Sequence, residues 1–363
     1  MTTTQEVSNL DDAGAVRRRD PGGMLGHAGA FGAQLRAGWE ISRSLTLGDL
    51  HRSAKSVAVL GMGGSAAAGD LVRGIFSDRL TVPIVAVRDY ELPAWVGRET
   101  LVVAASHSGS TEETISALGA ALERRCPVIA MTTGGPIGDV AARVGLPRLV
   151  FPNETPPRAS LGYTLMLLAG LLERAGMLTL DDAEIEAAVA AADAVAASCG
   201  PEKPTESNLA KQIAWSVLDR LPIIEGSGFL AAVARRWKTQ LNENSNSIAV
   251  AEELPEAMHN TVVGYDQPDA LRDHQYVLFL KGDADHARNA ARAALSVELL
   301  DAVSIAHQTV VIEGDGRLAQ AVTAISLGDY VSCYLGLLYG MDPSATPVLT
   351  HVKQRMAELG QDD

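Results

Sequence analysis

Short apolar runs alternate with amphipathic segments along the first part of the chain. The apolar runs have the length of buried strands, and the segments between them show the spacing of apolar positions that is typical of helices. Because strands that alternate with helices favour a parallel, doubly wound sheet, we expect an α/β fold. The predicted strands are Val57–Leu60, Val82–Val87, Leu101–Ala105, Val128–Thr132 and Arg148–Phe151.

The same pattern starts again after two long predicted helices and a proline-containing linker at Cys199–Ser207. A strand, a Gly/Ser turn and a helix follow at Leu221–Leu241 as they do at Val57–Phe76, which suggests a weak internal repeat of one α/β unit. We therefore predict an N-terminal extension with a leading helix (residues 1–43), a first domain (44–200) and a second domain (201–363). The other segments named in this prediction are Met1–Val7 (disordered), Leu10–Arg18 (weakly helical), helices Gly26–Ser44, Leu161–Gly176, Asp181–Ala197, Ala287–Asp301, Leu318–Met341 and Pro347–Leu359, and strands Ser247–Ala251, Tyr276–Leu280 and Thr309–Ile312.

Ala105–Thr114 joins a predicted strand to a predicted helix and is rich in hydroxyl groups. Four of the six residues from Ser106 to Thr111 carry a hydroxyl, and Gly109 lies among them. A helix N-terminus offers backbone N–H groups and favours an anion, and small hydroxyl side chains add further donors. The stretch therefore predicts a phosphate-binding loop. A capping box from Ser110 to Glu113 is the alternative interpretation.

Gly61–Ser65 follows the first predicted strand and is the second glycine-rich turn at a strand end. It resembles part of a dinucleotide-binding fingerprint, for which Asp89 would be the acidic residue. A hydroxyl-rich loop at the neighbouring strand end suits a compact phosphosugar better. The corresponding position of the second domain, Lys281–Asp285, has no Ser/Thr cluster, so we expect only the first domain to hold a phosphate.

Glu243 and His259 lie in a polar stretch of the second domain. Glu243 sits among amide side chains at a predicted helix end, and His259 follows a proline-containing turn. Each alone is compatible with a surface residue. Together they supply a carboxylate base and an imidazole acid, the pair that an aldose–ketose isomerisation needs.

Composition and charge exclude several classes of partner and site. The net charge of −14 argues against nucleic acid or an anionic membrane as a partner. The three cysteines, Cys126, Cys199 and Cys333, are far apart and in no metal-binding spacing. No 18-residue apolar run and no signal-peptide pattern are present, so we expect a soluble, cytoplasmic protein.

Four motifs together resemble the bifunctional phosphoglucose/phosphomannose isomerases of the sugar isomerase (SIS) domain superfamily. They are Gly-Met-Gly-Gly-Ser-Ala from Gly61, Ser-x-Ser-Gly-x-Thr-Glu-Glu-Thr from Ser106, Arg-Trp-Lys-x-Gln-x-Asn-Glu-Asn from Arg236 and Glu-Leu-Pro-Glu-x-x-His-Asn from Glu253. The resemblance covers the chain from about Ser44. It implies two SIS-type doubly wound domains with parallel sheets flanked by helices, no metal, no cofactor and a homodimer with its site at the subunit interface.

The resemblance also implies roles for individual residues. The phosphate would be held by Gly64, Ser65, Ser106, Ser108 and Thr111. Glu243 would move the proton, and His259 would assist ring opening, in this family from the other subunit. Arg158 would steady an enediolate, Lys353 would lie near the ring oxygen, and Thr346 matches a Thr tied to mannose-phosphate tolerance. His107 and Ser110 depart from the family, which more often has an aromatic residue and Asn there.

These implications define an aldose–ketose isomerase for hexose-6-phosphates that works through a cis-enediolate. A non-catalytic sugar-phosphate sensor with the same loops is an alternative from another class, because a shared fold does not establish catalysis. An aminosugar-phosphate isomerase on the same fold is the second alternative. A sensor would not need Glu243, His259, Arg158 and Lys353 together.

Overall fold

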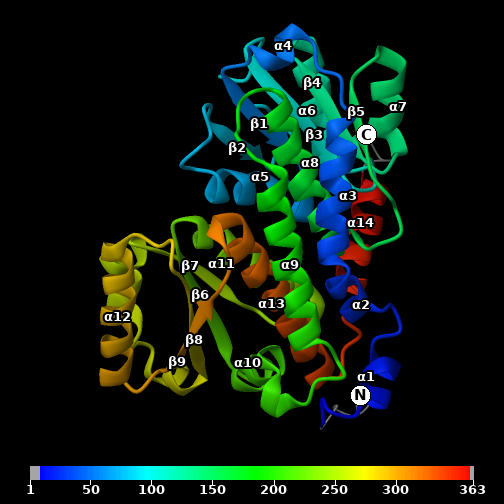
Figure 1. Cartoon of the computed structure of the whole chain (residues 1–363). Helices are drawn as coiled ribbons and strands as arrows, with labels where there is room; N and C mark the ends of the chain where they lie inside the picture. Colours follow the sequence, from blue (N-terminus) through cyan, green and yellow to red (C-terminus); the bar gives the residue numbers. More distant parts are fainter. Residues whose placement is uncertain (1–8, 360–363) are drawn as a thin grey trace.

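The computed structural model describes residues 9–359 and contains two separate parallel sheets (Figure 1). The first has the strand order β2-β1-β3-β4-β5, and the second has the order β7-β6-β8-β9. All pairings are parallel. The strands are β1 (Ser56–Leu60), β2 (Ile84–Val87), β3 (Thr100–Ser106), β4 (Val128–Thr132), β5 (Arg148–Val150), β6 (Leu221–Ser227), β7 (Val250–Leu254), β8 (Gln275–Gly282) and β9 (Ala306–Ile312).

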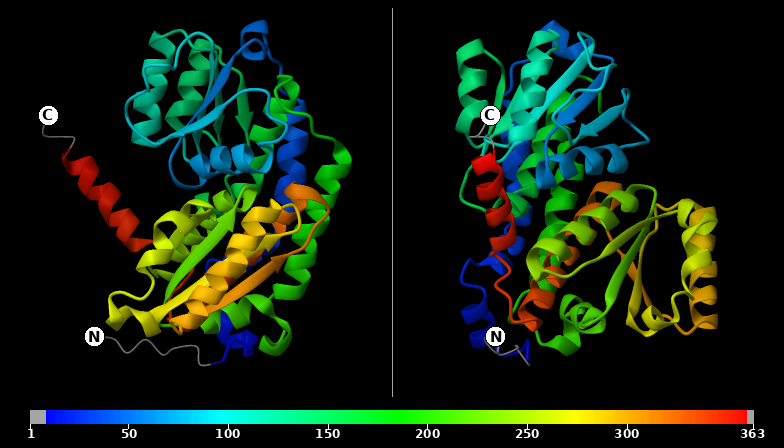
Figure 2. Two further views of the ribbon diagram at one scale, coloured as in Figure 1. Left: turned by 90° about the vertical axis from the view of Figure 1, so that its left-hand side faces the viewer. Right: turned by 180° about the vertical axis from the view of Figure 1, so that it is seen from behind.

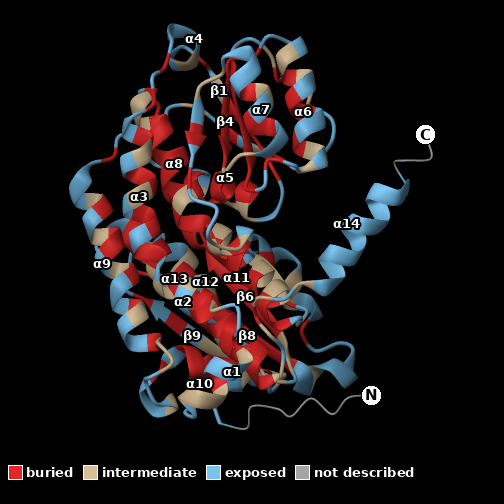
Figure 3. Ribbon diagram, turned by 90° about the vertical axis from the view of Figure 1, so that its right-hand side faces the viewer, coloured by how far each residue is buried: buried red, intermediate tan, exposed pale blue. Residues whose placement is uncertain are grey.

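Helices cover the sheets, and this is why the central strands read as continuous apolar runs. Every residue of β3 and β4 is buried (Figure 3). The two-domain α/β prediction is therefore confirmed as a fold class. The α-helices are α1 (Ala13–Arg19), α2 (Met24–Gly29), α3 (Phe31–Arg43), α4 (Asp49–Arg52), α5 (Gly63–Ile75), α6 (Glu112–Glu123), α7 (Gly135–Val144), α8 (Leu161–Arg174), α9 (Asp182–Cys199), α10 (Leu209–Val217), α11 (Phe229–Ser245), α12 (Ala287–Ala302), α13 (Gly316–Leu338) and α14 (Pro347–Leu359).

The structure differs from the sequence prediction at several element boundaries. The predicted helix Gly26–Ser44 is two helices, α2 and α3, interrupted at Ala30 after Gly29. Glycine is a weak helix former, and a side chain at position 29 would lie 3.1 Å from the Tyr330 hydroxyl. Strand β7 begins at Val250 rather than at Ser247. Helix α10 is absent from the sequence prediction, although Asn208 caps its N-terminus by accepting a bond from the Lys211 N–H.

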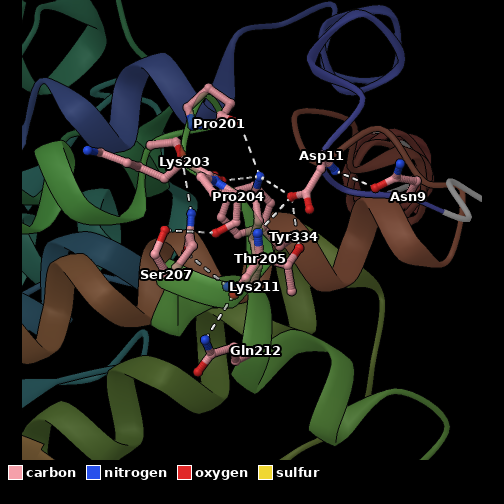
Figure 4. Close-up of polar contacts among 12 residues, drawn as sticks. Asn9, Asp11, Pro201, Lys203, Pro204, Thr205, Ser207, Lys211, Gln212 and Tyr334 are labelled. Atoms are coloured by element: carbon pink, nitrogen blue, oxygen red, sulfur yellow. Dashed lines mark hydrogen bonds and ion pairs between the residues drawn. The ribbon is translucent and has the colours of Figure 1, made fainter.

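The N-terminal extension is attached to the start of the second half of the chain through Lys211. This side chain is fully buried, and its Nζ lies 3.1 Å from Asp11 Oδ1 and donates to the carbonyls of Pro201 and Lys203 (Figure 4). The backbone and hydroxyl of Thr205 also donate to Asp11. Asp11 thus neutralises a buried ammonium group. The prediction of disorder for Met1–Val7 lies outside the described residues.

Helices α13 and α14 have opposite environments. Among the described helices, α13 alone is long and apolar enough to span a membrane, but it is a core helix that α9, α10 and α11 surround. Helix α14 projects from the body and has no buried residue (Figures 2 and 3). Its exposed apolar side chains are Val348, Leu349, Val352, Met356 and Leu359.

Candidate active site

The two predicted phosphate-binding turns lie side by side at the carboxyl edge of the first sheet. Strand β1 ends at Leu60 and β3 at Ser106, and the two strands are neighbours. The order β2-β1-β3 reverses direction between them, which is the switch point where doubly wound sheets bind ligands. The first turn lies against the end of β3, because a side chain on Gly61 would lie 2.7 Å from the carbonyl oxygen of Ala105. One anion can therefore face both turns.

The hydroxyl groups of the second turn are paired with one another. Ser106 Oγ lies 2.8 Å from Thr111 Oγ1, and Ser108 Oγ lies 2.8 Å from Ser110 Oγ. The N-cap of α6 is Thr111, and it makes no side-chain capping bond. The capping box from Ser110 to Glu113 is therefore not formed. The free N–H groups at the start of α6 and the paired hydroxyls suit an anionic ligand.

Gly109 is required by the backbone of this turn. Its φ is +66°, a left-handed conformation that other residues rarely adopt. A side chain on Gly109 would also lie 1.9 Å from the carbonyl oxygen of Gly134, in the turn that follows β4. The close approach of these two turns fixes the shape of the hydroxyl-rich loop.

The His107 side chain points into the core and not toward the hydroxyl groups of the loop. Its ring is buried and packs edge-on against Phe151 at a centroid distance of 5.7 Å. Burial lowers the pKa of His107, which favours the neutral imidazole. Its carbonyl accepts bonds from the backbone and hydroxyl of Thr133. The imidazole is thus packed into the core beside Phe151, and the neighbouring hydroxyl groups stay paired in the loop.

Arg158 lies beside the glycine-rich turn and is bonded to Asn244, which follows Glu243 on α11, although these residues are far apart in the sequence. Arg158 lies in a short 3-10 helix, Pro157–Ala159, that follows β5, and only 6% of it is exposed. A side chain on Gly64 would lie 3.8 Å from the Arg158 Cα. Burial lowers the pKa of Arg158, and the nearby charge of Glu243 acts in the opposite direction. The guanidinium stays cationic at neutral pH because the ordinary pKa of an arginine is so high.

Three other residues with predicted roles do not bond to Arg158 or Glu243 within residues 9–359 of one chain. They are His259, Lys353 and Thr346. His259 is exposed on the 3-10 helix Glu256–His259 that follows β7. Lys353 is exposed on α14, and Thr346 is half-buried just before that helix. Within the described part of the chain, no hydrogen bond or ion pair joins His259 or Lys353 to Glu243 or Arg158. The roles predicted for His259 and Lys353 therefore require that a second copy of the chain brings them to the site.

The switch point of the second sheet, between β6 and β8, is filled by a side chain of the protein. Asp285 Oδ1 accepts a bond of 2.8 Å from Ser227 Oγ, and its Oδ2 accepts a bond of 3.2 Å from the Gly282 N–H. Burial raises the pKa of Asp285, but these two bonds act in the opposite direction. A carboxylate thus occupies the place of an external anion, which supports the prediction that only the first domain binds phosphate.

Sequence reasoning assigns no role to the polar residues that surround Arg158. Asn244, Arg236 and Gln240 are all buried on α11, and Asp329 faces them from α13. The sequence does contain a pattern that could have revealed them. Polar residues recur at every fourth position of α11, a helix that also contributes Trp237 and Leu241 to the core.

Comparison with known proteins agrees with this geometry. Residues 51–141 match the SIS domain, and residues 206–356 match the bacterial phospho-glucose isomerase C-terminal SIS domain. The chain is 36% identical over 327 residues to the bifunctional phosphoglucose/phosphomannose isomerase of Caldicellulosiruptor bescii, covering 90% of this chain and 96% of the relative. The chain belongs to the bifunctional phosphoglucose/phosphomannose isomerase family.

Two further comparisons extend this family assignment. The family member of Aquifex aeolicus is 31% identical over 309 residues, which cover 83% of this chain and 90% of the relative. The fold is also that of the hypothetical protein TT0462 from Thermus thermophilus. That crystal structure has a TM-score of 0.74 at 18% identity and covers 95% of this chain and 94% of its own. The predicted resemblance is confirmed, whereas the role of each site residue stays a prediction.

Proposed function

We propose that this isomerase interconverts glucose-6-phosphate, and mannose-6-phosphate, with fructose-6-phosphate through a cis-enediolate. The observation that carries the proposal is that Arg158 lies against the glycine-rich turn at Gly64 and is bonded by Asn244, the neighbour of Glu243 on α11, while the Glu243 charge acts on its guanidinium. A carboxylate base, a cation for a developing oxyanion and a phosphate-binding loop are the groups that this reaction requires.

The proposed reaction divides the work among these groups. Ser65, Ser106, Ser108 and Thr111, with the N–H groups at the starts of α5 and α6, hold the phosphate. Glu243 removes the proton from C2 of the aldose and returns it to C1. The negative charge that develops on the enediolate oxygens is stabilised by Arg158, whose burial strengthens this interaction.

A second copy of the chain completes the site in this proposal. His259 and Lys353 are both exposed, and α14 presents five exposed apolar side chains to solvent. Exposed apolar surface of this kind favours a protein contact. We place His259 of the partner subunit beside Glu243, where it assists ring opening, and we expect α14 to be covered in the dimer with Lys353 near the ring oxygen. Thr346 lies directly before α14, on the same segment of the chain.

We also propose that the protein is cytoplasmic and that it binds neither nucleic acid nor a membrane. The acidic net charge of −14 supports both exclusions. The predicted boundary between the domains, at residues 200 and 201, falls between the two ranges that match family models and is kept as part of the proposal.

A coupled assay on the purified protein tests the proposed function. Each hexose-6-phosphate is supplied separately, with EDTA present, and conversion to the ketose or aldose is followed. We expect turnover with glucose-6-phosphate and with mannose-6-phosphate that EDTA does not reduce. Tight binding of a hexose-6-phosphate without turnover would instead support the sugar-phosphate sensor.

A further inference from the structure

Three buried polar residues form a stripe along one face of α11. Arg236, Gln240 and Asn244 are spaced four residues apart, and at most 3% of each is exposed. Residues with this spacing lie on the same side of a helix. Burying three polar side chains is costly unless each has a partner, so the partners of the stripe indicate what it does.

The C-terminal residue of the stripe binds the guanidinium of Arg158. Asn244 Oδ1 accepts a bond of 2.7 Å from Arg158 Nε, and Asn244 Nδ2 donates a bond of 3.0 Å to Ser332 Oγ. Arg158 Nη2 donates to the carbonyl of Pro343 at 2.6 Å. Two of the three guanidinium nitrogens are thus held, and Nη1 makes no hydrogen bond within residues 9–359.

The other residues of the stripe support the backbone of the same arginine. Arg236 Nη2 donates a bond of 2.6 Å to the Arg158 carbonyl and lies 3.5 Å from Asp329 Oδ1. Gln240 Nε2 donates to that same Asp329 oxygen at 2.6 Å. Arg158 belongs to the first half of the chain, whereas the stripe belongs to the second. Helix α11 therefore fixes both the main chain and the side chain of a residue from the other half.

We infer that Asn244 is a positioning residue for Arg158, which it orients so that Nη1 faces the reacting oxygens. The inference rests on the proposed isomerase function. Asn244 also follows Glu243 directly on α11, so one helical turn sets the position of both the base and the cation. The bond to Nε restricts rotation of the guanidinium, and in its absence the cation would be free to turn away from the enediolate.

Replacement of Asn244 by a residue without an acceptor tests this inference. In Asn244→Leu the Nε bond is lost, and we expect kcat to fall about 10- to 100-fold, as for the loss of a hydrogen bond to a charged group. KM for glucose-6-phosphate should change less than about threefold, because the phosphate loops are unaltered. Asn244→Asp keeps an acceptor oxygen for Nε and should retain more turnover than Asn244→Leu, although its added charge partly offsets that of Arg158.

A matched control separates this effect from damage to the helix. Ser245 is the next residue of α11 and is equally buried, and among residues 9–359 its hydroxyl donates only to the Leu241 carbonyl of its own helix. Ser245→Ala should lower the thermal midpoint, whereas its kcat should stay within about twofold of the wild type. If Asn244→Leu retains kcat within twofold of the wild type, the positioning role is excluded.

A double-mutant comparison identifies the residue through which Asn244 acts. Arg158→Lys keeps the charge but lacks Nε, so adding Asn244→Leu to it should cost little further turnover. An equal loss in both backgrounds would show that Asn244 acts through folding alone.

Binding of an enediolate mimic provides a readout that does not require turnover. Calorimetry with a phosphorylated hydroxamate should show weaker binding to Asn244→Leu, whereas the affinity for inorganic phosphate should be unchanged. A wild type without turnover would refute the proposed function but would leave this comparison intact. Unchanged hydroxamate affinity in the variant would refute the positioning role.

Discussion

Ser108 is an exposed residue whose hydroxyl belongs to the predicted phosphate loop. We expect Ser108→Ala to remove one hydrogen bond to a charged ligand, which contributes about 1.5–3 kcal/mol. The corresponding loss in kcat/KM is roughly 10- to 150-fold. Folding should be nearly unaffected because the site is a surface turn, and a thermal melt checks this. Unchanged kinetics with glucose-6-phosphate would remove the loop from the substrate site.

We expect Glu225 to make the stability of the protein depend on pH. It is 1% exposed in β6, accepts a hydrogen bond from the Tyr265 hydroxyl, and burial raises its pKa to about 7. The native state therefore keeps a proton that the unfolded chain releases near the ordinary glutamate pKa of 4.5. Because the native state binds more protons between these values, its stability falls as the pH rises through this window, by about 3 kcal/mol in total.

The variant Glu225→Gln removes this titration. We expect its free energy of unfolding to rise relative to the wild type by about 3 kcal/mol between roughly pH 4.5 and pH 8. Urea unfolding of both proteins across this range measures the difference. Parallel pH profiles for the two proteins would contradict the raised pKa.

The local sequence was sufficient to predict where the hydroxyl-rich turn lies. It was not sufficient to predict which distant residues contact the candidate site. The Ser106–Thr111 turn could be predicted because hydroxyls, Gly109 and a following helix are contiguous in the chain. The bond between Arg158 and Asn244 joins residues 86 positions apart, and no local pattern specifies it. The same holds for Asp285, whose carboxylate fills the second switch point only once β6 and β8 are paired.

At the scale of elements, two ion pairs join the N-terminal extension to α10 and to the segment before it. Asp11 neutralises the buried Lys211, whereas the side chains of Arg17 and Glu202 form an ion pair that is mostly exposed. We expect Asp11→Ala to destabilise the protein by about 1–3 kcal/mol, because a buried charge loses its partner. Glu202→Ala should cost less than about 0.5 kcal/mol, since exposed ion pairs contribute little.

Chemical denaturation of both variants checks this difference. An Asp11→Ala protein as stable as Glu202→Ala would show that the buried contact contributes no more than the surface pair. The comparison also tests whether the extension belongs to the folded unit, because the sequence predicts only a weakly helical segment there.

The boundaries of helices and strands agree with the predicted ones where the pattern of apolar positions is uninterrupted. They differ where contacts between distant residues determine the end of an element. The bounds of β4 and α14 are as predicted. Helix α11 continues past Leu241 to Ser245 although its end is polar. The continuation is explained by the buried contacts of Asn244, which sequence spacing alone does not reveal.

At the scale of the whole molecule, the proposed dimer is tested by mixing two inactive chains. Glu243→Gln and His259→Ala are each expected to lose activity. If His259 crosses the interface, one of the two sites in a heterodimer regains both groups, and activity returns in part. The assay is made on a sample in which native mass spectrometry detects the heterodimer. No recovery in that sample would place both residues in one chain's site.

The central claim is that Glu243 moves a proton between C2 and C1, and exchange with solvent tests it most directly. A carboxylate that holds the proton in a half-buried site allows some exchange with water. In deuterated buffer, the wild type should introduce deuterium at C1 of fructose-6-phosphate and, in reverse, at C2 of the aldose. Glu243→Gln should introduce none and lose about 10²–10⁴-fold in turnover, while it still binds the phosphorylated hydroxamate. Near-wild-type turnover and exchange in Glu243→Gln would contradict the account and make Glu253 and Glu256 the next candidates for the base.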